Sequence, residues 1–368
     1  MINENDNYFF GLLSRFLLTF AVCTYCFRSF FALNYFSQTT LFFTLAKSSF
    51  SGASSFSGIS ITPMGLGESI LMSPGAENQL VPLPDDWRYT IQNMMLEGRI
   101  IPIHKDNYKF RKEVGSGAFG SVYSARRVSN HKPVAIKVVT LAKLKSGETE
   151  ALVESILTEI SMMHRLLRAS KHIVHLYDFD FHNQTGLAFL IMELGEHDLE
   201  AELKSQPRLS PETRKQIWRQ LVKIALVLHE NNIVHLDIKP QNLIVFPGNI
   251  IKLVDLGIAQ KAHQHRINAY FLSNGTWLYS APEVRLVPNH HVALSTSKSD
   301  VWSWGAVLYR MTYRVPPDYK PPCHHPPKNQ HKYRDPDLVD ILRHTLVLDP
   351  KDRVGPSWLA RHPYTRKH

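Results

Sequence analysis

Apolar side chains recur at two different spacings in the middle of the chain. Three short runs are typical of β-strands: 121–125, 134–139 and 188–192. Between the second and third runs, apolar side chains recur every three or four residues at Ile156, Ile160, Met163 and Leu167. Positions with that spacing share one face of a helix, so we expect an amphipathic helix over 152–167. The pattern predicts a sheet accompanied by one helix.

The first part of the chain follows neither spacing. Residues 1–80 contain only seven charged side chains, and 37–60 is rich in serine, threonine and phenylalanine. The uncharged run 16–27 is too short to span a bilayer comfortably, although it has the length of a signal-peptide apolar core. A membrane or signal segment, a poorly structured extension and an unreliable chain start stay open as interpretations. We favour the second or third and treat 1–107 as a low-charge extension.

The composition is that of a folded chain, with 44% hydrophobic and 20% charged residues. The formal net charge of +10 would suit nucleic acid or an anionic membrane as a partner. However, the basic side chains are scattered, and no basic stripe with interleaved aromatics appears before the short basic tail 365–368. We therefore expect neither direct contact with nucleic acid nor association with a membrane.

Cysteine and histidine positions give little support for a disulfide framework or a metal site. The three cysteines, Cys23, Cys26 and Cys323, form a sparse and odd-numbered set that favours a reducing compartment. The first two lack a second pair at zinc-finger spacing. Cys323 precedes His324 and His325 among prolines, where we expect a loop rather than a metal site.

Gly115, Gly117 and Gly120 form a G-x-G-x-x-G pattern between two predicted strands. A dinucleotide-binding loop would lead into a helix, whereas a glycine-rich hairpin between strands is the arrangement of protein kinases. Glycine lets the backbone approach phosphate groups closely. We expect nucleotide contacts from nine consecutive residues: Val114, Gly115, Ser116, Gly117, Ala118, Phe119, Gly120, Ser121 and Val122.

The strand at 134–139 matches the kinase strand whose lysine holds the α- and β-phosphates of ATP, so Ala135 and Lys137 are predicted nucleotide contacts. A lysine in an apolar strand needs an anionic partner, and Glu159, beside the apolar helix face, is our candidate. Weaker alternatives for that partner are Glu148, Glu150 and Glu154. A buried run then enters a polar stretch that we expect to contact adenine as a hinge: Met192, Glu193 and Gly195.

The block His235-Leu-Asp237-Ile-Lys239-Pro-Gln-Asn242 carries the strongest chemical signal of the chain. In a kinase catalytic loop of this pattern, Asp237 orients the attacking hydroxyl and accepts its proton, and Lys239 neutralises γ-phosphate charge. Asn242 and, thirteen residues later, Asp255 would supply oxygen ligands for Mg²⁺. The series predicts phosphoryl transfer that depends on ATP and Mg²⁺.

The activation segment is expected to run from Asp255 to the Ala-Pro-Glu motif that ends at Glu283. Thr276 stands where serine/threonine kinases carry a threonine that contacts the catalytic aspartate and lysine. We count it among the catalytic residues, and with Lys239 it favours serine and threonine as acceptors.

Two positions depart from the kinase pattern. Leu236 replaces an arginine that pairs with a phosphorylated activation loop, so control through that contact is doubtful. Leu256 replaces a phenylalanine but still suits an apolar slot. Two structural roles are also predicted: Glu283 should pair with Arg353, and Asp300 should bind the backbone of the catalytic loop.

These motifs predict an α+β fold of the two-lobed eukaryotic protein kinase type. We expect a β-rich N-lobe over 108–194 and a larger helical C-lobe over 195–364, with ATP and Mg²⁺ between them. The γ-phosphate would pass to serine or threonine of proteins, and tyrosine stays open as a further acceptor.

Within the kinases, residues 108–364 resemble the TTK (monopolar spindle) family of dual-specificity kinases. The resemblance rests on 173–179, 192–195, 198–199, 298–303, 308–313, 362–364 and the leucine at 236. It implies spindle-checkpoint signalling, kinetochore scaffold proteins as substrates, and a nuclear or cytoplasmic location with kinetochore binding in mitosis. Between 314 and 337 the chain is shorter than the family, and its paired prolines favour an extended loop over the family's small helix.

Two other interpretations stay open. A pseudokinase scaffold would bind ATP without turnover, although such proteins usually lose at least one of the residues Lys137, Asp237, Asn242 and Asp255, which are all present. The shortened lower lobe is the feature that keeps this interpretation open. A serine/threonine kinase outside the TTK family would carry the same catalytic motifs.

Overall fold

The computed structural model describes residues 96–117, 120–141, 146–182, 186–206, 208–261, 278–285, 296–328, 330 and 335–366. Several predicted features lie outside these ranges: the low-charge stretch up to residue 95, the site residues Ala118, Phe119 and Thr276, and the last two residues of the basic tail.

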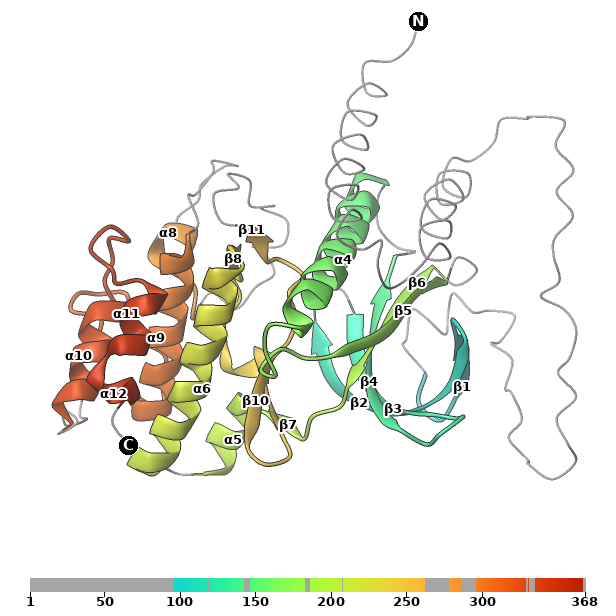
Figure 1. Cartoon of the computed structure of the whole chain (residues 1–368), viewed down its shortest axis with the longest axis horizontal. Coiled ribbons are helices and arrows are strands. Elements are labelled where there is room, and N and C mark those ends of the chain that lie inside the picture. The colour runs from blue at the N-terminus through green and yellow to red at the C-terminus, as the bar shows by residue number, and fades with distance from the viewer. Residues whose placement is uncertain are drawn as a thin grey trace, which may run out of the picture. The chain divides into compact units, whose positions relative to one another are not determined.

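Six antiparallel strands form one sheet in the order β1-β2-β3-β4-β6-β5 (Figure 1). Their bounds are Ile100–Ile103 (β1), Asp106–Gly117 (β2), Gly120–Arg127 (β3), Pro133–Thr140 (β4), Leu176–His182 (β5) and Leu187–Glu193 (β6). The three predicted strands lie within β3, β4 and β6. The sheet begins before residue 108, because the buried side chains of Ile101 and Ile103 carry β1 into it.

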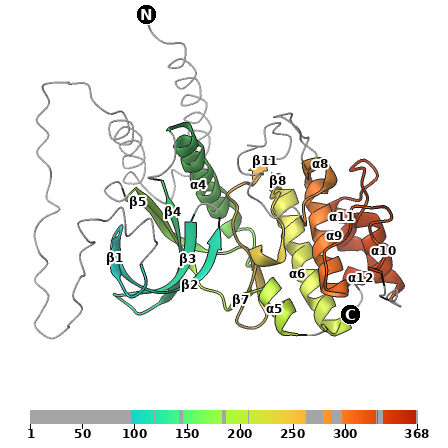
Figure 2. The ribbon, with the colours of Figure 1, turned by 180° about the vertical axis from the view of Figure 1, so that it is seen from behind.

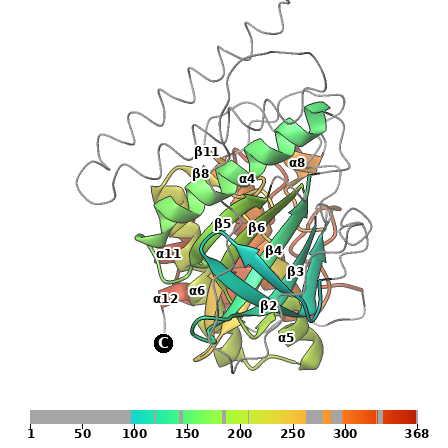
Figure 3. The ribbon, with the colours of Figure 1, turned by 90° about the vertical axis from the view of Figure 1, so that its right-hand side faces the viewer.

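Helix α4 (Ser146–Leu167) lies beside this sheet (Figure 3). It confirms the predicted helix and begins earlier than residue 152. Its buried face is formed by Leu152, Ile156, Ile160, Met163 and Leu166. Leu167, which the spacing assigned to this face, is only half-buried, because the buried positions advance by three residues at the last turn.

The second half of the described chain is mainly helical (Figure 2). Its helices are α5 (Leu199–Ser205), α6 (Pro211–Glu230), α8 (Pro282–Arg285), α9 (Ser297–Tyr313), α10 (Pro336–Thr345), α11 (Pro356–Arg361) and α12 (Pro363–Arg366), with a 3-10 turn η1 (Pro240–Asn242). This half also contains five short strands: β7 (His197–Asp198), just before α5, and β8 (Ile233–Val234), β9 (Leu243–Phe246), β10 (Ile250–Leu253) and β11 (Gln260–Lys261), between α6 and α8. Helix α9 is buried almost all round, which is typical of the central helix of a lobe.

The stretch between α9 and α10 has no helix among its described residues, 314–328 and 330. Its prolines lack the amide donor that a helix needs; they are Pro316, Pro317, Pro321, Pro322, Pro326 and Pro327. These residues form bends and turns without a helix, in agreement with the preference for a loop over the family's small helix. Helix α12 includes Thr365 and Arg366, so it continues into the predicted basic tail.

Two hydrophobic cores hold the described residues together. The smaller core is built from strands β1, β2, β3, β4 and β6 of the sheet, around Tyr108, Phe110 and Phe189. The larger core continues from α4, β5 and β6 into α6 and α9, and therefore joins the two lobes. This continuity fixes the elements that carry the predicted site. Within the described part of the chain, no helix is long and apolar enough to cross a membrane.

Candidate active site

The glycine-rich pattern forms the turn between β2 and β3. Gly115 pairs with Val122 and Gly117 pairs with Gly120 across this hairpin. A Cβ atom at Gly120 would lie 1.9 Å from the carbonyl oxygen of Val138 on β4, so no larger residue fits without moving the strand. Ala118 and Phe119, at the tip, lie outside the described residues.

Lys137 on β4 lies between two carboxylates that come from different elements. Its Nζ atom is 2.8 Å from Oε2 of Glu159 on α4 and 2.7 Å from Oδ1 of Asp255 after β10. The Glu159 side chain is 2% exposed, whereas that of Asp255 is 43% exposed. The predicted pairing of Lys137 with Glu159 is therefore present, and the contact with Asp255 joins the two lobes.

The electrostatics of these three groups follow from burial and proximity. Burial favours the neutral form of the Lys137 ammonium, but the carboxylates of Asp255 and Glu159 together raise its pKa above the ordinary value. The Lys137 charge in turn lowers the pKa of Asp255 to about 2. Burial raises the pKa of Glu159, and the Lys137 charge opposes that shift. Lys137 and Asp255 are therefore held as an ion pair.

The catalytic-loop residues meet around one carboxylate. Oδ2 of Asp237 is 2.7 Å from Nζ of Lys239 and accepts a hydrogen bond from Nδ2 of Asn242 at 2.9 Å. The same Nδ2 donates to the Asp237 carbonyl oxygen at 2.8 Å. The turn η1 brings Asn242 back to Asp237, so three of the four predicted catalytic residues lie together; Thr276 is outside the described residues.

Asn242 and Asp255 are also adjacent through the backbone, because the amide of Val254 donates to the Asn242 carbonyl oxygen at 3.0 Å. Nδ2 of Asn242 faces Asp237, so its other side-chain atom, the oxygen Oδ1, is the potential metal ligand. Asp255 contacts Lys137 through Oδ1 and has a second carboxylate oxygen. An amide oxygen and a carboxylate suit a hard cation, so the donor set fits Mg²⁺.

The catalytic loop is fixed by a buried carboxylate from α9. Asp300 accepts the amide hydrogens of His235 at 2.7 Å and Leu236 at 2.9 Å, which confirms its predicted role. Burial raises the pKa of Asp300 to about 7, although both amide donors favour the ionised form. The loop is thereby attached to the most deeply buried helix described in the C-lobe.

The predicted hinge begins at the end of β6, where Met192 and Glu193 are the last two residues of the strand, and continues to Gly195. Met192 pairs with Ala135 of β4. The carboxylate of Glu193 contacts Nζ of Lys252 at 2.6 Å and accepts the His175 amide at 2.7 Å. The side chain of Glu193 therefore binds protein groups, so the hinge contact expected of this residue falls to its backbone at the end of β6. At Gly195 a Cβ atom would lie 2.2 Å from the Cγ2 methyl of Ile244, so a larger residue here would force the Ile244 side chain to move.

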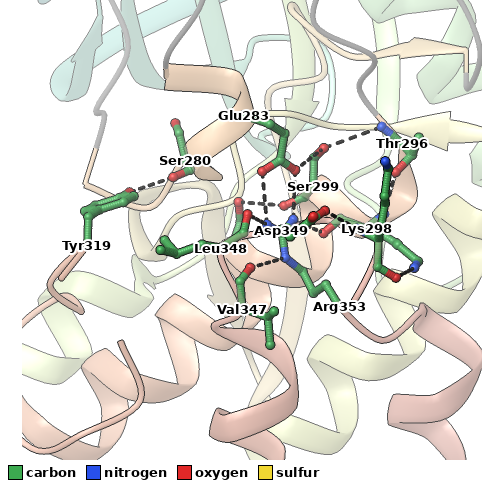
Figure 4. Close-up of polar contacts among 12 residues, drawn as sticks. Ser280, Glu283, Thr296, Lys298, Ser299, Tyr319, Val347, Leu348, Asp349 and Arg353 are labelled. Carbon is green, nitrogen blue, oxygen red and sulfur yellow. Dashed lines mark hydrogen bonds and ion pairs between the residues drawn. The ribbon is translucent and has the colours of Figure 1, made fainter. Parts of the chain in front are cut away.

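The end of the activation segment is attached to the C-terminal part of the lobe (Figure 4). Arg353, whose side chain is fully buried, contacts Glu283 at 2.8 and 3.0 Å through its two terminal nitrogens. The predicted pair of Glu283 and Arg353 is therefore confirmed. Arg353 also donates to the carbonyl oxygens of Lys298, Val347 and Leu348.

One contact was not predicted from the sequence. The hydroxyl of Ser155 on α4 donates to the Gly257 carbonyl oxygen at 2.5 Å, next to Asp255. Ser155 precedes Glu159 by one helical turn, so the two side chains share a face. The four-residue spacing of Ser155 and Glu159 was the feature of the sequence that could have indicated this contact. Helix α4 therefore contacts the Asp-Leu-Gly motif directly through Ser155 and β4 through Glu159.

A family model for the protein kinase domain matches residues 108–365, and the chain therefore belongs to the protein kinase family. Among its relatives, dual specificity protein kinase TTK of Mus musculus is 30% identical over 298 residues, which are 75% of this chain and 34% of the relative. Dual specificity protein kinase Ttk of Danio rerio is 31% identical over 267 residues, or 69% and 26%. Serine/threonine-protein kinase TIO of Arabidopsis thaliana is 30% identical over 270 residues, or 71% and 19%. The chain spans about a third or less of these relatives.

Proposed function

We propose that this chain transfers the γ-phosphate of ATP to serine or threonine side chains of proteins. The observation that carries the proposal is the position of Lys137 between Glu159 and Asp255. It connects the lysine expected to hold the phosphates with the carboxylate expected to hold Mg²⁺. Asp237 and Lys239, in contact with each other, supply the remaining groups that the reaction needs.

In the proposed reaction the acceptor hydroxyl attacks the γ-phosphorus of ATP. A bond forms between the hydroxyl oxygen and phosphorus, the bond from phosphorus to the bridging oxygen breaks, and ADP leaves. Asp237 orients the hydroxyl and takes its proton, while Lys239 supplies positive charge to the transferred group. Thr276 is proposed to contact both of these residues.

The nucleotide would be held by the glycine-rich hairpin from Val114 to Val122, by Ala135 and Lys137, and by the hinge at Met192, Glu193 and Gly195. Asn242 and Asp255 would hold Mg²⁺, which neutralises charge on the phosphate oxygens. Glu159 acts through Lys137: its carboxylate keeps the ammonium at the phosphates.

We further propose that the chain has a role like that of the TTK kinases. The two dual specificity relatives and the leucine at position 236 support this assignment. This assignment adds tyrosine as a second acceptor, kinetochore scaffold proteins as substrates, and mitotic spindle-checkpoint signalling in the nucleus or cytoplasm. A serine/threonine kinase of another family is the second candidate, because the TIO relative is equally similar to this chain at 30% identity.

The first test replaces Asp237 with Asn in the full chain. The amide cannot accept the hydroxyl proton, so phosphate transfer from ATP to casein should fall by at least about a hundredfold. Binding of a fluorescent ATP analogue should persist, because Lys137 and Asp255 are unchanged. Transfer is measured with radiolabelled ATP.

Asp352→Asn is the matched control, because Asp352 is exposed and outside the site; its transfer rate should equal that of the wild type. Full transfer by Asp237→Asn would refute the role of Asp237. No transfer by the wild type, with ATP binding intact, would favour the pseudokinase. A peptide library with serine, threonine and tyrosine acceptors would separate the TTK assignment from the second candidate.

A further inference from the structure

The proline-rich segment 314–328 reaches the end of the activation segment through one side chain (Figure 4). The hydroxyl of Tyr319 donates to the carbonyl oxygen of Ser280 at 2.6 Å. Ser280 lies immediately before the Ala-Pro-Glu motif and four residues after Thr276. The segment that lacks a helix therefore holds the backbone that follows the proposed catalytic residue Thr276.

The ring of Tyr319 is held by two further contacts. It stacks on Trp302 of α9, with ring centroids 5.4 Å apart and an interplanar angle of 28°. The guanidinium of Arg285 lies 4.0 Å from the centre of the Tyr319 ring. Trp302 is fully buried. The guanidinium carbon of Arg353, the partner of Glu283, lies 5.3 Å from the centre of the Trp302 ring. The contacts thus run from Ser280 to Glu283 through the interior of the lobe.

Another contact fixes the segment to α9 independently of Tyr319. The hydroxyl of Tyr309 donates to the His325 carbonyl oxygen at 2.7 Å. Just beyond the segment, Nε2 of Gln330 donates to the Tyr313 carbonyl oxygen at 3.1 Å. Cys323 is buried in the same lobe. Loss of the Tyr319 hydroxyl would therefore release Ser280 without releasing the segment.

The backbone that Tyr319 holds also presents an apolar side chain to solvent. Leu278 is 51% exposed, whereas the next residue, Tyr279, is buried. An exposed apolar side chain two residues after the proposed catalytic residue Thr276 is available to a polypeptide substrate. Its direction depends on the path of the backbone through Ser280.

We propose that Tyr319 is a positioning residue for the protein substrate. By holding the Ser280 carbonyl, it keeps Leu278 and the end of the activation segment in the orientation that an acceptor polypeptide contacts. The role rests on the proposed kinase function and concerns the acceptor protein, not ATP. The proline-rich segment thus supplies a substrate-positioning contact in a region where no helix is present among the described residues.

The test compares Tyr319→Phe with Tyr309→Phe. Each change removes one hydroxyl that donates to a carbonyl oxygen and retains the ring, but only Tyr319 contacts the activation segment. We expect Tyr319→Phe to raise the KM for casein about fivefold, the equivalent of one hydrogen bond, and to leave the KM for ATP unchanged. Tyr309→Phe should lower the melting temperature about as much as Tyr319→Phe does, because each loses one hydrogen bond. It should change neither the KM for casein nor the KM for ATP.

A second measurement does not depend on catalysis. The amides of Val284 and Arg285 both donate to the Ala281 carbonyl oxygen beside Ser280. Their hydrogen exchange should become faster in Tyr319→Phe and stay unchanged in Tyr309→Phe. If the wild type transfers no phosphate, the proposed function fails, and the exchange still reports on Tyr319. Unchanged casein KM and exchange in Tyr319→Phe, or equal changes in both variants, would overturn the positioning role.

Discussion

At the scale of single residues, Asp300 compensates for an unfavourable backbone in the catalytic loop. Leu236 has a φ of 68°, in the left-handed region, which costs a residue with a Cβ atom roughly 1–2 kcal/mol. The two amide hydrogen bonds to Asp300 hold the backbone in that conformation. The Leu236 side chain is buried in the core, so the departure from arginine replaces a phosphate-pairing group by a packing group.

The buried Asp300 predicts a pH dependence of stability. Its pKa is raised from 3.8 to about 7 in the folded chain, so the native state retains this proton up to about pH 7 while the unfolded state has lost it. The free energy of unfolding of the wild type, relative to Asp300→Asn, should therefore fall between pH 5 and 7, by at most about 1.4 kcal/mol per pH unit. Urea unfolding at three pH values measures the difference.

The comparison with Asp300→Asn also removes the effect of a neighbour. Burial lowers the pKa of His235, which makes the native state more stable as the pH rises towards 6.5. That trend is opposite in sign and is present in both proteins, so it cancels in the difference. A difference that stays constant from pH 5 to 7 would mean that Asp300 is ionised throughout this range.

At the scale of elements, the position of α4 relative to β4 and to the Asp-Leu-Gly motif decides whether the site is assembled. Two side chains one turn apart make that connection: Ser155 binds the Gly257 carbonyl oxygen and Glu159 binds Lys137. The buried face of α4 packs into the core shared with the C-lobe. Packing places the helix, and the polar contacts set its exact rotation.

Ser155→Ala tests this arrangement. It removes one hydrogen bond worth about 1 kcal/mol, so the proposed kcat/KM for casein should fall about fivefold as α4 and Glu159 lose part of their orientation. Ser161→Ala is the control, because Ser161 is exposed on the same helix and the gain in helix propensity is the same. Equal activity of both variants would show that core packing alone orients α4.

The elements that carry strong local signals were predictable, and those that depend on distant partners were not. The strand of Lys137 and the helix of Glu159 could be recognised from spacing. The charge of Lys137 in an apolar strand indicated the need for an anionic partner such as Glu159. The sequence did not reveal β1, because its burial depends on pairing with β2. It also did not reveal that Glu193 pairs with Lys252, because residues 59 positions apart meet only after the chain folds.

At the scale of the whole described molecule, its C-terminal part supports the end of the activation segment. Trp218 of α6 donates to Thr365 at 2.9 Å, and Arg214 donates to Tyr364 at 3.1 Å, so the last helix is bound to the body of the lobe. The turn before α11 provides Arg353, which pairs with Glu283. Substitutions in this part should therefore lower the free energy of unfolding and leave the chemistry of phosphate transfer largely unchanged.

Glu283→Gln tests that separation. It leaves the fully buried Arg353 side chain without its charge partner, and breaking a buried ion pair on one side costs about 3–5 kcal/mol of unfolding free energy. The KM for ATP should not change below the melting temperature, because the nucleotide residues are untouched.

Lys204→Gln is the control: its ion pair with Glu200 spans 3.9 Å and Lys204 is 72% exposed, so the loss should stay below about 1 kcal/mol. Urea unfolding measures both variants. Wild-type stability of Glu283→Gln would mean that the carbonyl acceptors of Arg353 suffice to hold it.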